Sequence, residues 1–261
     1  MKKLLFLTAI VSLLFVGCNN DNYDPSTETV RLLPSRIIAT HSWGSDTVIL
    51  EYDGQNRLVR LVGKPSSVSS SPPRPIVIMY DANSNPTNAG DKTFRHIGNQ
   101  VVAYGDTLTI GANGRLEGRT SWAGIETFVY DSRGNLTKIL RESESWDGSI
   151  SRDTTEFEYA NSNARSIWRH VNVPDWFVVH SLPWFIDWAL NTDRHASVTM
   201  TRNGLMPTQV RQTNWAWDSG SYWITRFDYG IYPNGYISHI TIGGDGWGSP
   251  DIWTIEWIPA R

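Results

Sequence analysis

Apolar and polar residues alternate with a period of two along much of the chain. Phe157 and Tyr159 fall on one face of an extended segment, while Glu156 and Glu158 fall on the other, and residues 253–257 repeat this alternation. A period of two is typical of half-buried β-strands. The pattern predicts an all-β protein of about fourteen to sixteen strands joined mostly by tight turns.

One short phrase recurs along the chain. FVYDSRGNLTKI at 128–139 is closely matched by LEYDGQNRLVRL at 50–61, and weaker copies follow. In each copy a Gly or Asn stands a few residues after the end of a strand, and these two residue types accept positive φ most easily. The predicted turn positions are Asn56, Gly114, Gly134, Asn163, Gly204 and Gly235. The phrase therefore predicts a repeated β-hairpin.

A single hairpin cannot bury its apolar face, so the copies are expected to pair side by side. We predict a long antiparallel meander of hairpins that forms a curved, barrel-like sheet. Ile76–Tyr80 is apolar on both faces, which predicts that both of its sides are covered. The segment 176–190 is apolar without alternation, and it predicts one short helical or apolar insert that closes one end of the sheet. A contact between this insert and a membrane surface is the alternative.

The N-terminus has the pattern of an exported lipoprotein. Two lysines precede an apolar run too short to span a membrane comfortably, and the run ends at Gly17-Cys18. The motif resembles the bacterial lipobox, and this resemblance implies that Cys18 is acylated. We therefore predict a signal peptide at 1–17, a lipidated flexible tether at 18–30 and one hairpin-repeat domain at 31–261.

Charge and motif spacing exclude several partners. Without residues 1–17, which hold two lysines, the net charge is −5 and no basic stripe remains, so nucleic acid is not expected. The histidines lack zinc-binding spacing. Residues 81–91 begin like a calcium loop, but Pro86 stands where glycine is required, and we interpret the stretch as a solvated loop. No metal and no cofactor is predicted.

Thirteen tryptophans are the most unusual feature of the composition. Trp215, Trp217, Trp223 and Trp247 fall on or near predicted loops, where exposed rings can bind a glycan or a peptide. The alternative is that these rings fill the interior of a wide sheet. The residue types therefore fit both an aromatic ligand-binding patch and a filled interior.

Catalytic signals are weak. No nucleophile motif or phosphate loop is present, and no catalytic residue is predicted. Asp175, Asp187 and Asp193 offer carboxylates for a glycan-acting hydrolase, although single carboxylates near helix starts are usually caps. The sequence favours non-catalytic binding of a glycan, peptide or envelope protein. A purely structural envelope component and the hydrolase are the alternatives.

The hairpin phrase resembles the tyrosine-aspartate repeats of RHS-type proteins. Together with the lipobox and the segments 184–190, 206–210 and 227–237, it is similar to a lipoprotein family of the Bacteroidota with a porin-like fold. The resemblance implies a barrel-like sheet and lipid anchoring to the outer membrane, on its periplasmic or cell-surface side. It implies no activity. We expect no pore, because the strands are too short and Lys138 and Arg226 would interrupt a lipid-facing band.

Overall fold

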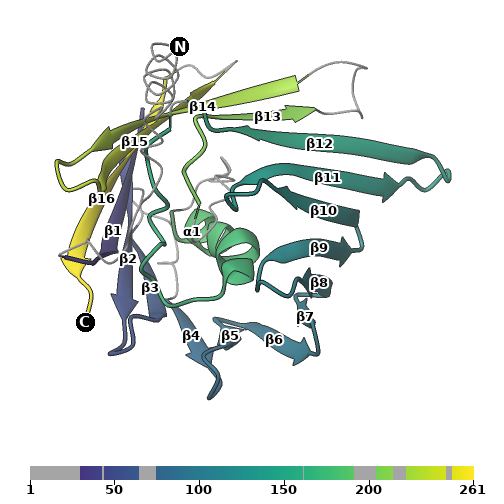
Figure 1. The fold of residues 1–261 in the computed structure, drawn as a ribbon, viewed down its shortest axis with the longest axis horizontal. Helices are drawn as coiled ribbons and strands as arrows, with labels where there is room; N and C mark the ends of the chain where they lie inside the picture. The colour runs from purple at the N-terminus through teal and green to yellow at the C-terminus, as the bar shows by residue number, and fades with distance from the viewer. Residues whose placement is uncertain are drawn as a thin grey trace, which may run out of the picture. The chain divides into compact units, whose positions relative to one another are not determined.

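The computed structural model describes residues 30–42, 44–64, 75–160, 162–190, 204–213, 222–244 and 249–261. The chain divides into two units, Met1–Arg31 and Leu32–Arg261, and the second forms a closed antiparallel barrel (Figure 1). Its strands are β1 (Leu32–His41), β2 (Gly44–Tyr52), β3 (Leu58–Lys64), β4 (Ile76–Tyr80), β5 (Pro86–Ala89), β6 (Lys92–Ile97), β7 (Gln100–Ala103), β8 (Asp106–Ile110), β9 (Leu116–Ser121), β10 (Gly124–Tyr130), β11 (Leu136–Glu144), β12 (Ile150–Glu158), β13 (Gln209–Thr213), β14 (Tyr222–Ile231), β15 (Ile237–Gly244) and β16 (Asp251–Pro259). Each strand pairs with its neighbours in sequence, and β16 closes the ring on β1. The predicted all-β meander is confirmed.

Six connections share one five-residue turn. In each turn the first N–H donates to the fifth carbonyl, and the fourth N–H donates to the first carbonyl. The turns are 53–57, 81–85, 111–115, 131–135, 145–149 and 232–236. Their fourth residues have positive φ: Asn56 (61°), Ser84 (64°), Gly114 (77°), Gly134 (89°), Gly148 (80°) and Gly235 (81°). Where the first residue is Asp, its Oδ1 also accepts backbone N–H groups, as Asp131 does from Arg133 (3.0 Å) and Asn135 (2.8 Å).

Four of the six predicted turn positions, Asn56, Gly114, Gly134 and Gly235, are thus fourth residues of these turns. Asn163 and Gly204 lie elsewhere. Both stand where the chain leaves and re-enters the barrel between β12 and β13, and the Ser166 N–H donates to the Gly204 carbonyl at 3.0 Å. Gly204 stands outside the five-residue turns, because it precedes β13 where the described chain leaves the insert.

The recurring tyrosines have a role beyond filling the barrel. Three of them donate their hydroxyl to the first carbonyl of the strand that follows the preceding turn at the same end, whereas Tyr52 and Tyr229 donate to Pro34 and Pro207. The pairs are Tyr80 with Leu58 (2.7 Å), Tyr130 with Leu116 (2.8 Å) and Tyr159 with Leu136 (2.7 Å). His96 Nε2 and Trp257 Nε1 make the equivalent bonds to Pro86 (2.9 Å) and Ile237 (2.8 Å). Burial raises the pKa of these tyrosines, so they stay protonated donors. Each copy of the phrase is therefore tied to its neighbour.

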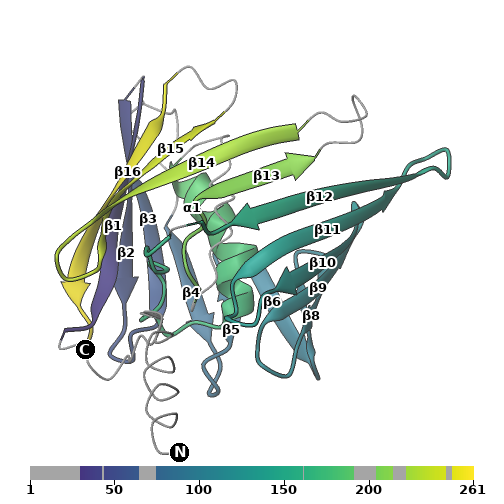
Figure 2. The same cartoon turned by 45° about the horizontal axis from the view of Figure 1, so that its top comes forward.

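The described parts of the insert between β12 and β13, residues 159–160, 162–190 and 204–208, fill the barrel. The insert contains a π-helical turn (Phe177–Ser181) and α1 (Leu182–Leu190), which lie inside the ring of strands (Figures 1 and 2). Its side chains are among the most buried in the protein: Trp168, Val171, Val173, Trp176, Phe177, Val178, Leu182, Phe185, Ile186 and Ala189. The predicted short helix near 176–190 is confirmed, but it occupies the interior instead of closing one end.

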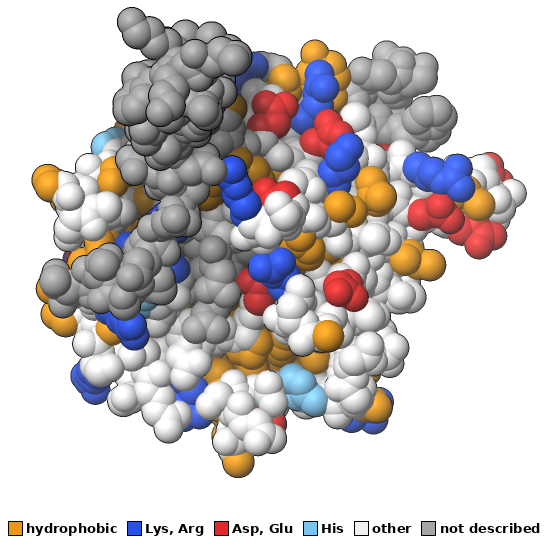
Figure 3. Space-filling view, in the orientation of Figure 1, with side chains coloured by type: hydrophobic (Ala, Val, Ile, Leu, Met, Phe, Trp, Pro, Cys, Tyr) orange, Lys and Arg blue, Asp and Glu red, His pale blue; other side chains and the backbone are white. Residues whose placement is uncertain are grey.

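The outer barrel surface carries charged pairs. Residues directly opposite on neighbouring strands form ion pairs, and basic and acidic side chains lie next to one another in Figure 3. The pairs are Arg36–Glu256 (3.0 Å), Arg60–Glu51 (3.1 Å), Lys138–Glu156 (2.8 Å) and Arg152–Glu142 (2.9 Å). Exposed pairs of this kind contribute about 0–1 kcal/mol each. Their charges matter more for the question whether the outer surface of the barrel faces water or lipid.

Two local predictions need correction. Ile76–Tyr80 is covered on one side only, since Val77 and Met79 of β4 are 50% and 59% exposed. Residues 81–91 do not form one loop, because β5 lies between a five-residue turn and a two-residue turn at Gly90-Asp91. Within the described residues, no helix combines the length and the apolar character that a membrane span requires.

Candidate functional site

The antiparallel meander distributes its connections over two rims. The connections that follow β2, β4, β8, β10 and β14 are five-residue turns, and together they mark what we call the turn rim. The connections that follow β5, β7, β9 and β11 lie at the opposite end. Trp122 is in the β9–β10 connection, Trp146 is in the β11–β12 connection and Trp223 is the second residue of β14. These three tryptophans therefore share the end opposite the turn rim.

Trp184 joins this group from the insert. It projects from α1 and its ring lies 6.0 Å from that of Tyr104, in the β7–β8 connection at the same end. In the described part of the chain, the tryptophans with large exposed areas are Trp122 (97%), Trp146 (100%), Trp184 (46%) and Trp223 (60%). We call the end that carries them the tryptophan rim. Trp168, Trp176 and Trp253, in contrast, are almost completely buried.

Only part of the predicted site lies among the residues that the structure describes. Trp223 is exposed on this rim, whereas Trp215, Trp217, Trp247 and the acylation candidate Cys18 lie outside the described residues. The sequence did not single out Trp122, Trp146 or Trp184. Trp122 and Trp146 each stand between two segments in which apolar and polar residues alternate. This position in the sequence identifies them as loop residues.

A pocket of about 650 Å³ opens at the tryptophan rim, between α1 and the strands β4–β6. Its size is within the range of small-molecule sites, about 300–1,000 Å³. It is lined by Pro75, Ile76, Val77, Ala89, Gly90, Asp91, Lys92, Trp184 and Phe185. Most of this lining is apolar, and Asp91 and Lys92 are its charged members.

Tyr104 organises the aromatic side of this region. It has a φ of +57°, which is unusual for a residue other than glycine, asparagine or aspartate. Its ring stacks on His180 (5.8 Å between centroids, 21° between planes) and meets Phe185 edge-on at 6.2 Å. Lys92 Nζ lies 5.7 Å from the centroid of Tyr104 and 5.6 Å from that of Trp184. The ammonium group thus lies within cation–π range of both rings.

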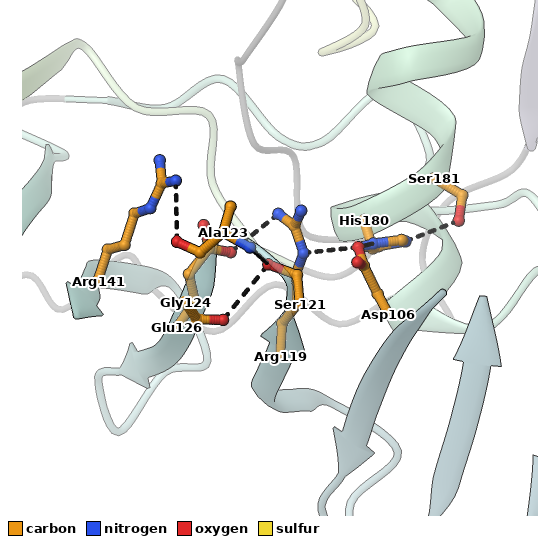
Figure 4. A network of polar contacts seen from close by, with 9 residues as sticks. All are labelled: Asp106, Arg119, Ser121, Ala123, Gly124, Glu126, Arg141, His180 and Ser181. Carbon is orange, nitrogen blue, oxygen red and sulfur yellow. Dashed lines mark hydrogen bonds and ion pairs between the residues drawn. The ribbon is translucent and has the colours of Figure 1, made fainter. Parts of the chain in front are cut away.

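A polar network supports this region from inside the barrel (Figure 4). Asp106 Oδ2 accepts a hydrogen bond from Arg119 Nε at 2.8 Å and lies 3.3 Å from His180 Nε2. Arg119 Nη1 also bonds Glu126 Oε2 at 3.1 Å. Burial alone would raise the pKa of Asp106, but the bond from His180 and the charge of Arg119 outweigh it and lower the pKa. The network joins the π-helical turn to β8, next to Tyr104.

Asp, His and Ser side chains meet in this network, yet their arrangement does not suit nucleophilic catalysis. His180 Nδ1 lies 3.0 Å from Ser181 Oγ, while Ser181 is completely buried and out of reach of a substrate. Of the carboxylates considered for hydrolysis, Asp175 precedes the π-helical turn, Asp187 lies within α1 and Asp193 falls outside the described residues.

No protein-family model matches the sequence, and no curated protein sequence matches it. Two solved structures of porin-like proteins are similar. One, from Bacteroides vulgatus, is 12% identical with a TM-score of 0.40, and the match covers 88% of this chain and 100% of that chain. The other, from Bacteroides uniformis, is 13% identical with a TM-score of 0.38, over 87% of this chain and 97% of that chain.

Aromatic rings and charged groups lie side by side at the pocket. Among the described residues, no group of three or more His, Cys, Asp or Glu side chains is arranged to hold a metal ion. Beside the Trp184 ring the pocket presents the Asp91 carboxylate and the Lys92 ammonium group.

Proposed function

We propose that this protein is a non-catalytic binding module of the bacterial envelope, and that its tryptophan rim binds carbohydrate. The observation that carries the proposal is that Trp122, Trp146, Trp184 and Trp223 lie at one end of the barrel with large exposed areas. Full burial of a large apolar side chain contributes about 1.5–3 kcal/mol, and these four residues give up part or all of it. Large exposed rings that share one end of a barrel make that end a candidate interaction surface.

Carbohydrate fits this surface better than other ligands of the same size. The C–H faces of a sugar ring pack against a flat indole, while its hydroxyls need polar partners at the edge of the ring. The tryptophan rim offers both, because Asp91 and Lys92 lie beside Trp184. A purely apolar ligand would leave these charged groups unpaired, at a cost in affinity.

Channel activity is not part of the proposal. The strands β4–β9 have only 5, 4, 6, 4, 5 and 6 residues, against about 9–11 for a membrane-spanning strand. In a membrane-spanning barrel the outer ion pairs would face lipid, where each Arg or Lys costs about 2–4 kcal/mol near the midplane. The insert also fills the interior with side chains. These features support a barrel whose outer surface faces water.

The location rests on the N-terminal sequence. A lipid on Cys18 would tether the barrel to the outer membrane, with residues 18–30 as a flexible connection and a periplasmic or cell-surface position for the barrel. Two or more acyl chains give durable anchoring, so the barrel itself needs no membrane contact.

Binding of polysaccharides by rim variants tests the proposal. Calorimetry or affinity electrophoresis with a panel of host and plant polysaccharides is expected to find at least one ligand. Trp122→Ala and Trp146→Ala should each weaken that binding about tenfold, since each removes about 1.4 kcal/mol of stacking. Both side chains are exposed, so neither variant should change the melting temperature.

Tyr232→Ala is the matched control. Tyr232 is 46% exposed but lies in a five-residue turn on the turn rim, and its loss should leave affinity unchanged.

If no polysaccharide binds, the structural role is favoured. If the rim tryptophans instead drive binding to phospholipid vesicles, the rim is a membrane contact. Release of reducing ends that is lost on Asp187→Asn would establish the hydrolase. Each of these results would overturn the proposal.

A further inference from the structure

We propose that the pocket between α1 and β4–β6 binds a single neutral sugar unit through a pair of neighbouring hydroxyls. This inference rests on the proposed function and names the position and the ligand class of one subsite. Three residues carry it: Trp184 as the stacking platform, Asp91 as hydrogen-bond acceptor and Lys92 as hydrogen-bond donor.

The platform is rigid. Trp184 is 46% exposed, and its ring contacts those of Phe185 (5.1 Å between centroids, 69° between planes) and Tyr104 (6.0 Å, 39°). Phe185 is buried and stands on the helix inside the barrel. An indole held by two neighbouring rings loses little freedom when a ligand packs on its exposed part, and this preorganisation favours binding.

Asp91 and Lys92 match two adjacent hydroxyls. An ionised carboxylate only accepts hydrogen bonds and an ammonium group only donates them, while a hydroxyl does both. Lys92 Nζ lies 3.4 Å from Asp91 Oδ2, and the side chain of Asp91 is 82% exposed. Two hydroxyls on neighbouring carbons can therefore each bond to one or both groups.

The balance of charge selects a neutral ligand. The pocket holds one positive and one negative side chain at close range, so their fields largely cancel. A charged sugar that turned toward the opposite charge would compete with the Asp91–Lys92 pair and would meet a like charge close by, so the pair gives it little net attraction.

The turn before β8 brings a further ring to the pocket. Tyr104 and Gly105 have positive φ (57° and 92°), as both positions of a two-residue hairpin turn require. The turn places the Tyr104 ring against Trp184 and beside Lys92.

Titration with small saccharides tests the inference. Neutral disaccharides of glucose, galactose and mannose, together with glucuronic acid and glucosamine, would be added to the full chain and followed by saturation-transfer NMR and calorimetry. We expect at least one neutral disaccharide to bind and both charged sugars to bind at least tenfold more weakly. Trp184→Ala and Lys92→Met should each reduce affinity at least tenfold.

Two further variants keep the test decisive. Asp91→Asn changes an exposed side chain and cannot unfold the barrel, and it should also weaken binding. Tyr232→Ala changes an exposed side chain on the turn rim, outside the proposed binding surface, and should leave disaccharide affinity unchanged. If polysaccharide binding depends on Trp122 and Trp146 while the pocket variants change nothing, the pocket assignment is wrong and the proposed function stands. If no saccharide of any size binds, both fail. Preference for glucuronic acid would overturn the neutral ligand class.

Discussion

Replacing Gly63 by alanine is expected to destabilise the barrel by about 2–3 kcal/mol, measured as the free energy of unfolding in urea. Gly63 lies on β3, where the end of α1 approaches the inner surface of the barrel. A Cβ atom built at this position would be 2.3 Å from the carbonyl oxygen of Ala189 and 3.0 Å from its carbonyl carbon. Both are backbone atoms and cannot rotate away, so either α1 or β3 must move.

Gly54→Ala supplies the control for this substitution. Gly54 is in the first five-residue turn, and no atom lies within 4 Å of the position that an added methyl group would take, so alanine should be tolerated there. Equal stability of the two variants would show that α1 does not pack against β3 as described. A loss confined to Gly63→Ala would establish the contact between the insert and the barrel.

Truncating Trp168 to alanine should cost about 3–5 kcal/mol, the largest effect we expect from a single substitution. Trp168 belongs to the insert and is 1% exposed, among the largest of the fully buried side chains. Its removal leaves a cavity inside the ring of strands, where the surrounding side chains cannot close completely. Thermal and urea unfolding would measure the loss.

Trp122→Ala is the matched comparison, since the same side chain is removed from a position that is 97% exposed. Its free energy of unfolding should stay within about 0.5 kcal/mol of the parent protein. Similar losses in both variants would mean that the insert does not fill the barrel. The contrast therefore separates tryptophans that stabilise the interior from those left exposed on the rim.

The hairpin turns could be predicted from the sequence because they depend on local chemistry. The fourth position of the five-residue turn has positive φ and therefore favours Gly114, Gly134 and Gly235. The side chain of Asp131 accepts hydrogen bonds from the backbone of its own turn. The hydroxyl bond of Tyr130 to Leu116 could not be predicted in the same way. Its partner belongs to the preceding hairpin, so it forms only when the two copies lie side by side.

The path of the insert depends on contacts that no local pattern encodes. The apolar run at 176–190 predicted a helix, but its place inside the barrel follows from packing against β3 at one end and against Phe94 of β6 at the other. Once the helix is inside, β4 needs cover only on its inner side. For this reason Val77 and Met79 remain exposed although the strand is apolar on both faces.

The candidate site was harder to predict than the fold. Tryptophan content allowed either an aromatic surface or a filled interior, and Trp223 is 60% exposed. Tyr104 and Lys92 meet Trp184 only because the insert brings α1 to the β5–β6 and β7–β8 connections. Such a meeting of distant segments leaves no signal in residue spacing.

Ion conductance across a planar lipid bilayer tests most directly whether this barrel is a water-facing binding module whose interior is filled by its own chain. The full-length protein, added to either side of the bilayer, is expected to leave conductance at the level of the lipid alone. A variant without the acyl site, Cys18→Ser, should remain in the aqueous phase. Stepwise channel openings, or stable insertion of the Cys18→Ser variant, would contradict the account.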